Sequence, residues 1–289
     1  MIHTVAITGA GSPIGKSLCK QISALKDIQV LKVSSSKSNS RERYANISEP
    51  GSAADVFEDL IPQTVIHLGH APISAFDGDE EKYKSLNKEF ALRLAESAYG
   101  QGCKRFIFAS SSAIYGDKYH GEISENAALN PNSIYAESKA EIEEALIHST
   151  RNTELNVCSA RIFNVFGQGL NTSFINKLIN FSTANFNEKL FMLGPENFIR
   201  DYIHVGDLSN VMSQLVASKI ALPNYVNIGT GIPTSNNDLL KYIPLEKRKQ
   251  IDLLEAEFSS SVANISVMRQ MLKYETFIKI EAEFPKTWI

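Results

Sequence analysis

A tyrosine and a lysine stand four residues apart in the stretch "NPNSIYAESKAEIEEAL", at Tyr135 and Lys139. The stretch has the pattern of a helix, and a spacing of four residues places both side chains on one helical face. A neighbouring ammonium favours the phenolate, so Lys139 is expected to lower the pKa of Tyr135. A phenol with a lowered pKa can exchange a proton near neutral pH. The pair alone is a weak motif, because common residues meet at a fixed spacing by chance.

Two further features suit the same chemistry. The run "FIFASSSAIYGD" is predicted to be a strand that ends in a serine cluster, whose hydroxyls can bind a substrate oxygen. A serine-rich turn would look alike. The run "TVAITGAGSPIG" places Gly9, Gly11 and Gly15 between a predicted strand and a predicted helix. Such glycines allow a pyrophosphate to approach the backbone at a helix N-terminus, although a plain glycine-rich turn is the simpler alternative.

Short apolar runs alternate with helical patterns over the first half of the chain. Strands are predicted at "TVAITGA", "QVLKVSS", "TVIHLGH", "RFIFASSS" and "LNVCSARIF", and helices at about residues 15–25 and in "EEKYKSLNKEFALRLAESAYG". This alternation predicts a parallel sheet with helices on both faces. The pattern weakens after Asn164, where "YVNIGTG" is the clearest strand. The predicted fold class is therefore α/β, a doubly wound parallel Rossmann sheet with a smaller, irregular C-terminal substrate domain.

Composition excludes several classes of protein. The chain has 289 residues and a formal net charge of −3, which does not indicate a nucleic-acid partner. No apolar run is long enough to span a bilayer, and the N-terminus lacks the layout of a signal peptide. The three cysteines match no metal spacing, so we expect reduced core thiols, no metal and a cytoplasmic protein.

The order of five motifs resembles one family. A Gly-rich turn, strand-end serines and Tyr-x-x-x-Lys are followed by "ARIFNVFG" and "IRDYIHVGDL". This order resembles the extended short-chain dehydrogenase/reductase family of NAD(P)-dependent nucleotide-sugar epimerases, dehydratases and ketoreductases. The resemblance covers about Thr4 to Gly231. The Gly-rich turn is similar to the family's G-x-x-G-x-x-G, with Ser12 in place of the middle glycine.

The resemblance implies a catalytic set of Ser111, Tyr135 and Lys139. Ser111 would hold the sugar oxygen, Tyr135 would exchange its proton, and Lys139 would also hydrogen-bond the cofactor ribose. A nicotinamide would carry the hydride. Tyr115, four positions after Ser111, is either a pocket wall or a packing residue.

The cofactor site has matches of different strength. The second strand ends in Ser34 and Ser35, where NAD-binding folds usually place an acid, and Lys37 and Arg41 follow. Hydroxyls and cations suit a 2′-phosphate, so the sequence favours NADP, with NAD possible. By resemblance, the expected cofactor-binding residues are Gly9, Gly11, Ser12, Pro13, Ile14, Gly15, Ser34, Ser35, Asn46, Ile47, Leu68, Gly69, His70, Tyr135 and Lys139.

The substrate implied by the resemblance is a nucleotide sugar, bound by Ser111, Tyr135, Asn164 and Arg200. A guanidinium binds phosphate oxygens as a fork, which suits Arg200 to the pyrophosphate. Asn164 could otherwise cap a turn, and Arg200 could pair with Asp201. We expect a dinucleotide-binding domain at residues 1–164 plus about 204–228, and a nucleotide-sugar domain at about 165–203 plus 229–289.

Two differences between this sequence and the family's motifs reduce the number of reactions that we expect. Ser112 and Ala113 stand where dehydratases place acids, so water elimination is not expected. The strand-end serines favour NADPH and hence reduction of a nucleotide-linked 4-keto (deoxy)sugar, with C4 epimerisation by bound NAD as the alternative. A non-catalytic dinucleotide-binding sensor is a third hypothesis, disfavoured by the intact Ser111–Tyr135–Lys139 set. The sequence does not identify the nucleotide, the sugar or the stereochemistry.

The resemblance also implies a homodimer. The helices that carry residues 86–98 and 142–146 resemble those of the family's four-helix dimer interface, and a two-fold dimer is the commonest oligomer.

Overall fold

The computed structural model describes residues 2–35, 43–58, 60–183, 190–194, 197–255, 257–272, 274 and 276–284. The chain divides into two compact units. The first comprises residues 1–114, 129–161 and 209–226, and the second comprises residues 115–128, 162–208 and 227–289.

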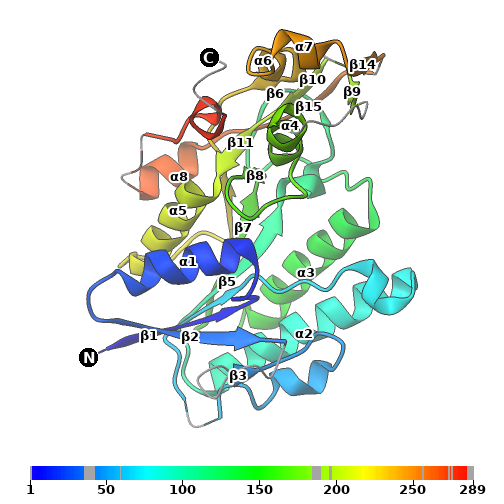
Figure 1. The fold of residues 1–289 in the computed structure, drawn as a ribbon. Coiled ribbons are helices and arrows are strands. Elements are labelled where there is room, and N and C mark those ends of the chain that lie inside the picture. Colours follow the sequence, from blue (N-terminus) through cyan, green and yellow to red (C-terminus); the bar gives the residue numbers. More distant parts are fainter. Residues whose placement is uncertain are drawn as a thin grey trace. The chain divides into compact units, whose positions relative to one another are not determined.

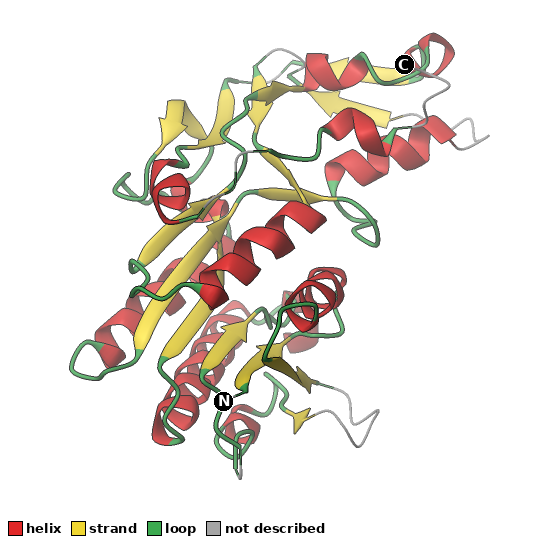
Figure 2. Cartoon of the chain, turned by 90° about the vertical axis from the view of Figure 1, so that its left-hand side faces the viewer, coloured by secondary structure: helices red, strands yellow, loops and turns green. Residues whose placement is uncertain are grey.

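A seven-stranded sheet forms the centre of the first unit (Figures 1 and 2). Its strand order is β12-β7-β5-β4-β1-β2-β3. The strands are β1 (His3–Thr8), β2 (Ile28–Ser34), β3 (Arg43–Tyr44), β4 (Thr64–His67), β5 (Arg105–Ser111), β7 (Asn156–Ile162) and β12 (Tyr225–Ile228). The pairs β1–β2, β2–β3, β1–β4 and β4–β5 are parallel. The chain leaves β1 toward β2 and returns on the other side at β4, so the strand order reverses between β1 and β4. Ligands bind at such a reversal, beyond the carboxyl ends of the strands.

Helices cover both faces of this sheet (Figure 1). They are α1 (Pro13–Ser23), α2 (Glu80–Gly100), α3 (Ile134–Thr150) and α5 (Val205–Ala217). Right-handed crossovers in opposite directions from the sheet centre place α1 and α2 on opposite faces. Helix α3 packs beside α2, where Lys88 of α2 pairs with Glu141 of α3 at 2.8 Å. Short 3-10 helices η1 (Pro50–Ala53), η2 (Ile73–Phe76) and η3 (Ser112–Tyr115) complete the connections.

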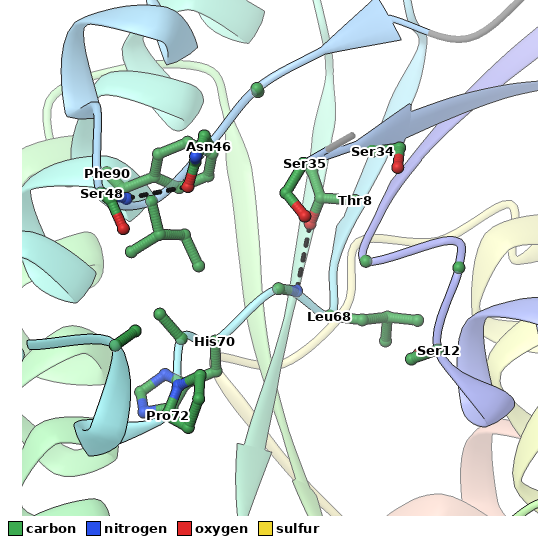
Figure 3. A pocket seen from close by; sticks show the side chains of 17 residues that line it. Thr8, Ser12, Ser34, Ser35, Asn46, Ser48, Leu68, His70, Pro72 and Phe90 are labelled. Atoms are coloured by element: carbon green, nitrogen blue, oxygen red, sulfur yellow. Dashed lines mark hydrogen bonds between the residues drawn. The ribbon is translucent and has the colours of Figure 1, made fainter. Parts of the chain in front are cut away.

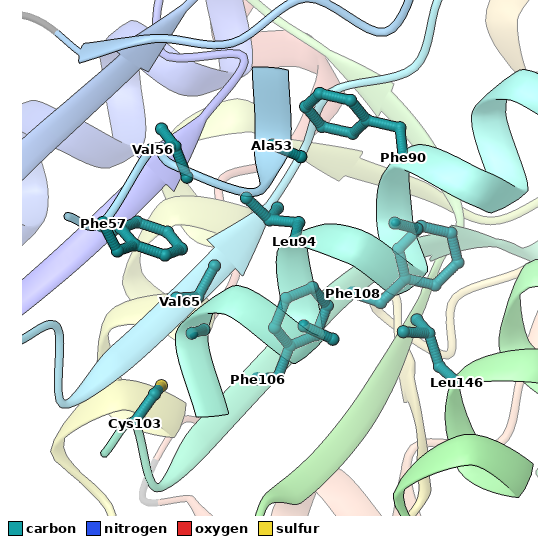
Figure 4. Close-up of a cluster of buried hydrophobic side chains, with 14 of the residues drawn as sticks. Ala53, Val56, Phe57, Val65, Phe90, Leu94, Cys103, Phe106, Phe108 and Leu146 are labelled. Carbon is teal, nitrogen blue, oxygen red and sulfur yellow. The ribbon is translucent and has the colours of Figure 1, made fainter. Parts of the chain in front are cut away.

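The core between the sheet and the α2–α3 pair is rich in phenylalanine (Figure 4). Phe57, Phe90, Phe106 and Phe108 are all at most 2% exposed. Full burial of one such side chain contributes about 1.5–3 kcal/mol. This core fixes β5 and α3, the two elements that carry the predicted catalytic residues.

The second unit contains smaller sheets and short helices. A four-stranded sheet has the order β13-β10-β15-β6, and the pairs β8–β11 and β9–β14 are separate. The strands of the second unit are β6 (Lys118–Ile123), β8 (Asn164–Phe166), β9 (Leu190–Leu193), β10 (Phe198–Arg200), β11 (Tyr202–His204), β13 (Thr234–Ser235), β14 (Ile251–Leu254) and β15 (Ser259–Ala263). Its helices are α4 (Phe174–Thr183), α6 (Asn236–Leu240), α7 (Leu245–Arg248), α8 (Ser266–Met271) and η4 (Ile280–Glu283). Residues 115–128 belong to this unit because β6 pairs with β15.

The predicted fold class is confirmed: a mostly parallel sheet with flanking helices, of the Rossmann type. Cys19, Cys103 and Cys158 are buried free thiols, as the sequence suggested. Across the described ranges, no helix combines the length and apolarity that a membrane span needs.

Candidate active site

The glycine-rich turn joins the end of β1 to the start of α1. Gly9 has φ +67°, which favours glycine, and a Cβ there would lie 3.1 Å from the backbone nitrogen of Gly69. A Cβ on Gly15 would lie 2.3 Å from the carbonyl oxygen of Gly9, so only glycine fits. Ser12 caps α1, and its hydroxyl accepts a hydrogen bond from the Gly15 amide at 3.0 Å. Gly11 is different, because a Cβ there would meet nothing within 4 Å.

A cavity of about 510 Å³ lies beside this turn (Figure 3). Ten of the predicted cofactor residues line it: Gly9, Gly11, Ser12, Ser34, Ser35, Asn46, Ile47, Leu68, Gly69 and His70. Three predicted cofactor residues do not line the cavity. They form the first turn of α1, directly after Ser12: Pro13, Ile14 and Gly15. The predicted cations Lys37 and Arg41 lie outside the described residues. The structure thus brings segments after β1, β2 and β4 together at one end of the sheet.

Several lining residues were not predicted: Thr8, Ala45, Ser48, Ala71, Pro72, Ala75 and Phe90. Thr8 has a clear role, because its hydroxyl accepts from the Gly69 amide at 3.2 Å and lies 2.7 Å from Nδ1 of His67 (Figure 3 draws the Gly69 bond). The hydroxyl thereby ties the loops after β1 and β4 together. Thr8 is the last residue of β1, and this position at the carboxyl end of a parallel strand could have indicated that it lies at the site.

His67, the last residue of β4, is a packed residue. Its ring is 1% exposed and lies among Phe90, Phe106 and Phe108. Burial, with a smaller effect from Lys139, lowers the pKa of His67 to about 3. The imidazole is therefore neutral and serves to orient Thr8.

The three predicted catalytic residues come from β5 and α3. Ser133 caps α3, accepting from the Ala136 amide at 3.3 Å, so Tyr135 stands in the first turn and Lys139 in the next. A side-chain hydrogen bond joins Ser111, the last residue of β5, to Tyr135. Hydroxyls from two elements thus meet at one point, where a substrate oxygen could be held by both.

Lys139 is almost fully buried, at 2% exposure. Its Nζ donates to the carbonyl oxygen of Ala109 at 2.7 Å and lies 4.6 Å from the centroid of the Phe108 ring. Burial lowers the pKa of Lys139 to about 7, although the Glu143 carboxylate opposes this effect. A lysine with this pKa changes its charge in the physiological range.

The electrostatic expectation for Tyr135 was not met in this structure. Although 40% of the Tyr135 surface is exposed, burial around the hydroxyl raises its pKa, and the hydrogen bond from Ser111 only partly offsets the rise. Lys139 is not among the causes that act on this pKa. The physical reason is burial, which disfavours both the phenolate and the ammonium.

Glu143, one helical turn after Lys139 on α3, forms a buried ion pair with Arg161. This pair was not predicted from the sequence. The Glu143 carboxylate accepts from Nε of Arg161 at 3.1 Å and from its Nη2 at 2.8 Å, and both side chains are at most 3% exposed. The Arg161 guanidinium also stacks on Tyr225 at 4.0 Å. Lys139 and Glu143 are four residues apart and so share one face of α3, and this spacing is the sequence feature that could have indicated a role for Glu143.

The two predicted substrate residues Asn164 and Arg200 line a second cavity, of about 460 Å³, in the second unit. Nη2 of Arg200 donates to Oγ of Ser259 at 2.7 Å and lies 3.4 Å from Oδ2 of Asp117. Its guanidinium stacks on Phe198 at 3.7 Å. The side chain of Asn164 donates to the backbone oxygen of Asp201 at 3.0 Å. Unpredicted residues of this cavity are Val165, Thr172, Ser173, Phe174, Phe198, Tyr202 and Asn236.

Two other residues are structural. Asp201 is fully buried and accepts hydrogen bonds from Thr230, Gly231 and Ala263, so it is not a surface partner of Arg200. Tyr115 is also fully buried, and its hydroxyl donates to Oδ1 of Asn227 at 2.8 Å. Tyr115 therefore packs in the second unit.

Known proteins resemble the chain over most of its length. The chain is 27% identical over 295 residues to an uncharacterized UDP-glucose epimerase, YtcB, of Bacillus subtilis strain 168, covering 94% of this chain and 92% of the relative. A UDP-glucose 4-epimerase from Thermotoga maritima, solved with UDP-glucose, superposes with a TM-score of 0.81 at 21% identity, over 96% of this chain and 95% of that one. MoeE5, solved with UDP-glucuronic acid and NAD, superposes with a TM-score of 0.80 at 23% identity, over the same shares. At these identities the two structures establish the fold alone.

The family model decides the classification. The model for the NAD dependent epimerase/dehydratase family matches residues 5–229, which is most of the chain. The resemblance seen in the order of the sequence motifs is thereby confirmed. This chain belongs to the NAD dependent epimerase/dehydratase family.

Proposed function

We propose that the chain interconverts nucleotide sugars that differ in configuration at C4, with Tyr135 exchanging the proton of the C4 hydroxyl. The observation that carries the proposal is the hydrogen bond between Ser111 and Tyr135, one helical turn from the buried Lys139. In the reductive direction the Tyr135 phenol, which its raised pKa keeps protonated, donates its proton to the ketone oxygen, and in the oxidative direction the phenolate form of Tyr135 takes the hydroxyl proton. Ser111 holds the same oxygen in both directions.

The residues of the first cavity fit a nicotinamide dinucleotide. Gly9 and Gly15 permit only a bare backbone, and the α1 N-terminus follows directly. When bound, the dinucleotide supplies hydride exchange with the sugar carbon. Ser12, Gly11 and Gly69 would contact its phosphates and ribose, and Asn46 and Ile47 would flank its adenine. Lys139 would hydrogen-bond a ribose hydroxyl, at the cost of its bond to Ala109 or in addition to it.

The second cavity is proposed as the nucleotide-sugar site. Arg200 presents a guanidinium already fixed by Ser259 and Asp117, and a fixed fork suits a pyrophosphate. Asn164 lines the same cavity. We accordingly propose that the first unit binds the dinucleotide and the second binds the nucleotide sugar.

We prefer epimerisation to net reduction because relatives of the chain, YtcB among them, are described as UDP-glucose epimerases. Net reduction of a 4-keto sugar by NADPH is the second candidate, favoured by one observation. Ser34 and Ser35 line the cavity where an acid would select NAD, and the hydroxyls would accept a 2′-phosphate. Dehydration is not proposed, because Ser112 and Ala113 cannot move protons in the required way.

A turnover experiment without added cofactor separates these reactions. The purified protein is incubated with UDP-, dTDP- and GDP-sugars, and the products are identified by NMR. The proposal predicts a C4 epimer at equilibrium and NAD in the denatured protein. Product formation only with stoichiometric NADPH would establish the reductase instead. Dinucleotide binding with no turnover of any sugar would contradict both and support a sensor.

The homodimer expected from the resemblance remains a prediction. Leu94, Ala98, Ile142 and Leu146 all lie in the core of their own chain, so a dimer would use other faces of α2 and α3. Those faces carry exposed charged residues such as Glu81 and Glu144. Light scattering at micromolar concentration should give twice the chain mass of 32.0 kDa, and a monomer mass would refute the prediction.

A further inference from the structure

Three neighbouring strands of the second unit bring an acidic residue beside Arg200. Arg200 is the last residue of β10, Ser259 is the first residue of β15, and Asp117 directly precedes β6. The strand order in this sheet is β10-β15-β6, so Ser259 stands between the guanidinium and the carboxylate. No role proposed above uses the charge of Asp117.

The Arg200 guanidinium is held in place by contacts that do not involve Asp117. Its Nη1 donates to the carbonyl oxygens of Ile199 at 2.8 Å and Ser259 at 3.0 Å, and its Nη2 donates to Oγ of Ser259 at 2.7 Å. One face of the guanidinium stacks on the Phe198 ring at 3.7 Å. The Arg200 side chain is 11% exposed, and Arg200 lines the second cavity. A ligand in this cavity therefore meets a guanidinium whose plane is already fixed.

These contacts leave few donors of Arg200 for a ligand. A guanidinium has five N–H donors, and the main-chain oxygens and the Ser259 hydroxyl take both hydrogens of Nη1 and one of Nη2. The Nε hydrogen and one Nη2 hydrogen remain for other acceptors. A phosphate that binds a guanidinium as a fork takes two parallel N–H donors. A fork contact to Arg200 must therefore use this remaining Nη2 hydrogen.

Asp117 occupies the surroundings of the same Nη2 group. Its Oδ2 lies 3.4 Å from Nη2 of Arg200 and accepts a hydrogen bond from Oγ of Ser259 at 2.9 Å. Burial lowers the pKa of Arg200, and the Asp117 carboxylate opposes this effect. A buried guanidinium needs a counter-charge, and Asp117 supplies it. A pyrophosphate at Arg200 would be a second anion at the same place.

We propose that Asp117 competes with the pyrophosphate of the nucleotide sugar for Arg200, and that this competition weakens the binding of nucleoside diphosphates and so favours release of the product. The inference rests on the proposed function, since it requires a nucleotide sugar in the second cavity. The hydrogen bond from Ser259 keeps the carboxylate near Arg200, so a bound phosphate experiences the repulsion of a like charge.

Calorimetric titration of Asp117→Asn with UDP, dTDP and GDP, each separately, tests the competition without measuring activity. The substitution keeps an acceptor for Ser259 and removes only the charge. The nucleoside diphosphate that the unaltered protein binds best should bind Asp117→Asn roughly fivefold more tightly, the scale of the repulsion between unit charges about 4 Å apart in water. The Asp117 side chain is 35% exposed, so this gain should shrink at about 1 M KCl, where the Debye length is about 3 Å.

The direction of the change separates competition from a positioning role. If Asp117 served to position Arg200, Asp117→Asn would bind the nucleoside diphosphate more weakly. Glu122→Gln removes the same charge from an exposed residue of β6 and is the matched control, which should bind as the unaltered protein does. The Ser260 amide donates to the main-chain oxygen of Asp117, and this bond survives the substitution. Asp117→Ala is the second variant and should also bind more tightly.

The outcomes distinguish this inference from the proposed function. If the unaltered protein binds a nucleoside diphosphate but Asp117→Asn binds it equally or more weakly, the competition is wrong and the proposed function stands. An equal gain from Glu122→Gln would likewise refute the competition, because the effect would then come from net charge. If the unaltered protein binds none of the three nucleoside diphosphates, the proposed nucleotide-sugar site itself fails. Should Asp117→Asn not fold, the affinity of Asp117→Ala decides the question by the same criteria.

Discussion

Lys139 Nζ lies 5.8 Å from the centroid of the Tyr135 ring, on the next turn of the same helix. The two groups are close enough to interact, yet Nζ itself is directed to the carbonyl of Ala109. Burial acts on both, because it disfavours the charge that each would carry in catalysis. The effect of this burial on the free energy of unfolding can be measured without an assay of turnover.

The burial of Lys139 predicts a pH dependence of stability. The pKa of Lys139 is about 7 in the folded protein, against 10.5 as its ordinary value. Between these values the unfolded chain binds a proton that the folded protein has released, so stability rises with pH. The free energy of unfolding of the unaltered protein, minus that of Lys139→Met, should increase between pH 7 and 10 by up to about 1.4 kcal/mol per pH unit. Urea titrations measure it, and a flat difference would show that Lys139 has its ordinary pKa.

The Glu143–Arg161 pair predicts a large loss of stability from a small substitution. Glu143→Gln is nearly isosteric but removes the negative charge that pairs with the buried Arg161 guanidinium at 2.8 Å. Breaking one side of a buried pair costs about 3–5 kcal/mol. The neighbouring Glu144 is exposed, so Glu144→Gln should change stability by no more than about 0.5 kcal/mol. Equal stability of the two variants in chemical denaturation would contradict the structure at this pair.

Two glycines of the first turn should respond differently to alanine. Gly15→Ala places a Cβ 2.3 Å from the Gly9 oxygen, so the turn must shift. We expect lower thermal stability and loss of dinucleotide binding. Gly11→Ala meets no protein atom within 4 Å but lines the cavity, so it should keep the stability and weaken only dinucleotide binding. Melting curves and calorimetric titrations on both variants test the difference, which would vanish if the turn were merely flexible.

The sequence predicted those parts of the fold that depend on local pattern. The helix predicted at "EEKYKSLNKEFALRLAESAYG" coincides with α2 (Glu80–Gly100), because helical periodicity and the Asp79 cap are both local signals. Likewise the glycines, with the strand before them and the helix after them, predicted the first turn. Parallel pairing could be inferred from the alternation of strands and helices.

Features set by contacts between distant segments could not be predicted in this way. Strand β6 forms by pairing with β15, more than 130 residues later, and its exposed residues carry no clear strand pattern. The Tyr83–His70 bond and the Glu143–Arg161 pair join different elements of the sheet and its helices. The pKa of Tyr135 depends on how deeply its hydroxyl is buried, and helical spacing alone does not give that depth.

Turnover of Tyr135→Phe on a nucleotide sugar that the unaltered protein accepts tests whether Tyr135 exchanges the substrate proton. The substitution keeps the ring, and with it the edge-on contact to the His70 ring, and removes only the hydroxyl. If Tyr135 exchanges the proton, the rate constant should fall by roughly 10²–10⁴, the usual contribution of general acid–base catalysis. Dinucleotide affinity should persist, because the turn from Gly9 to Gly15 is unchanged. Turnover of Tyr135→Phe at the rate of the unaltered protein would show that Tyr135 does not exchange the proton.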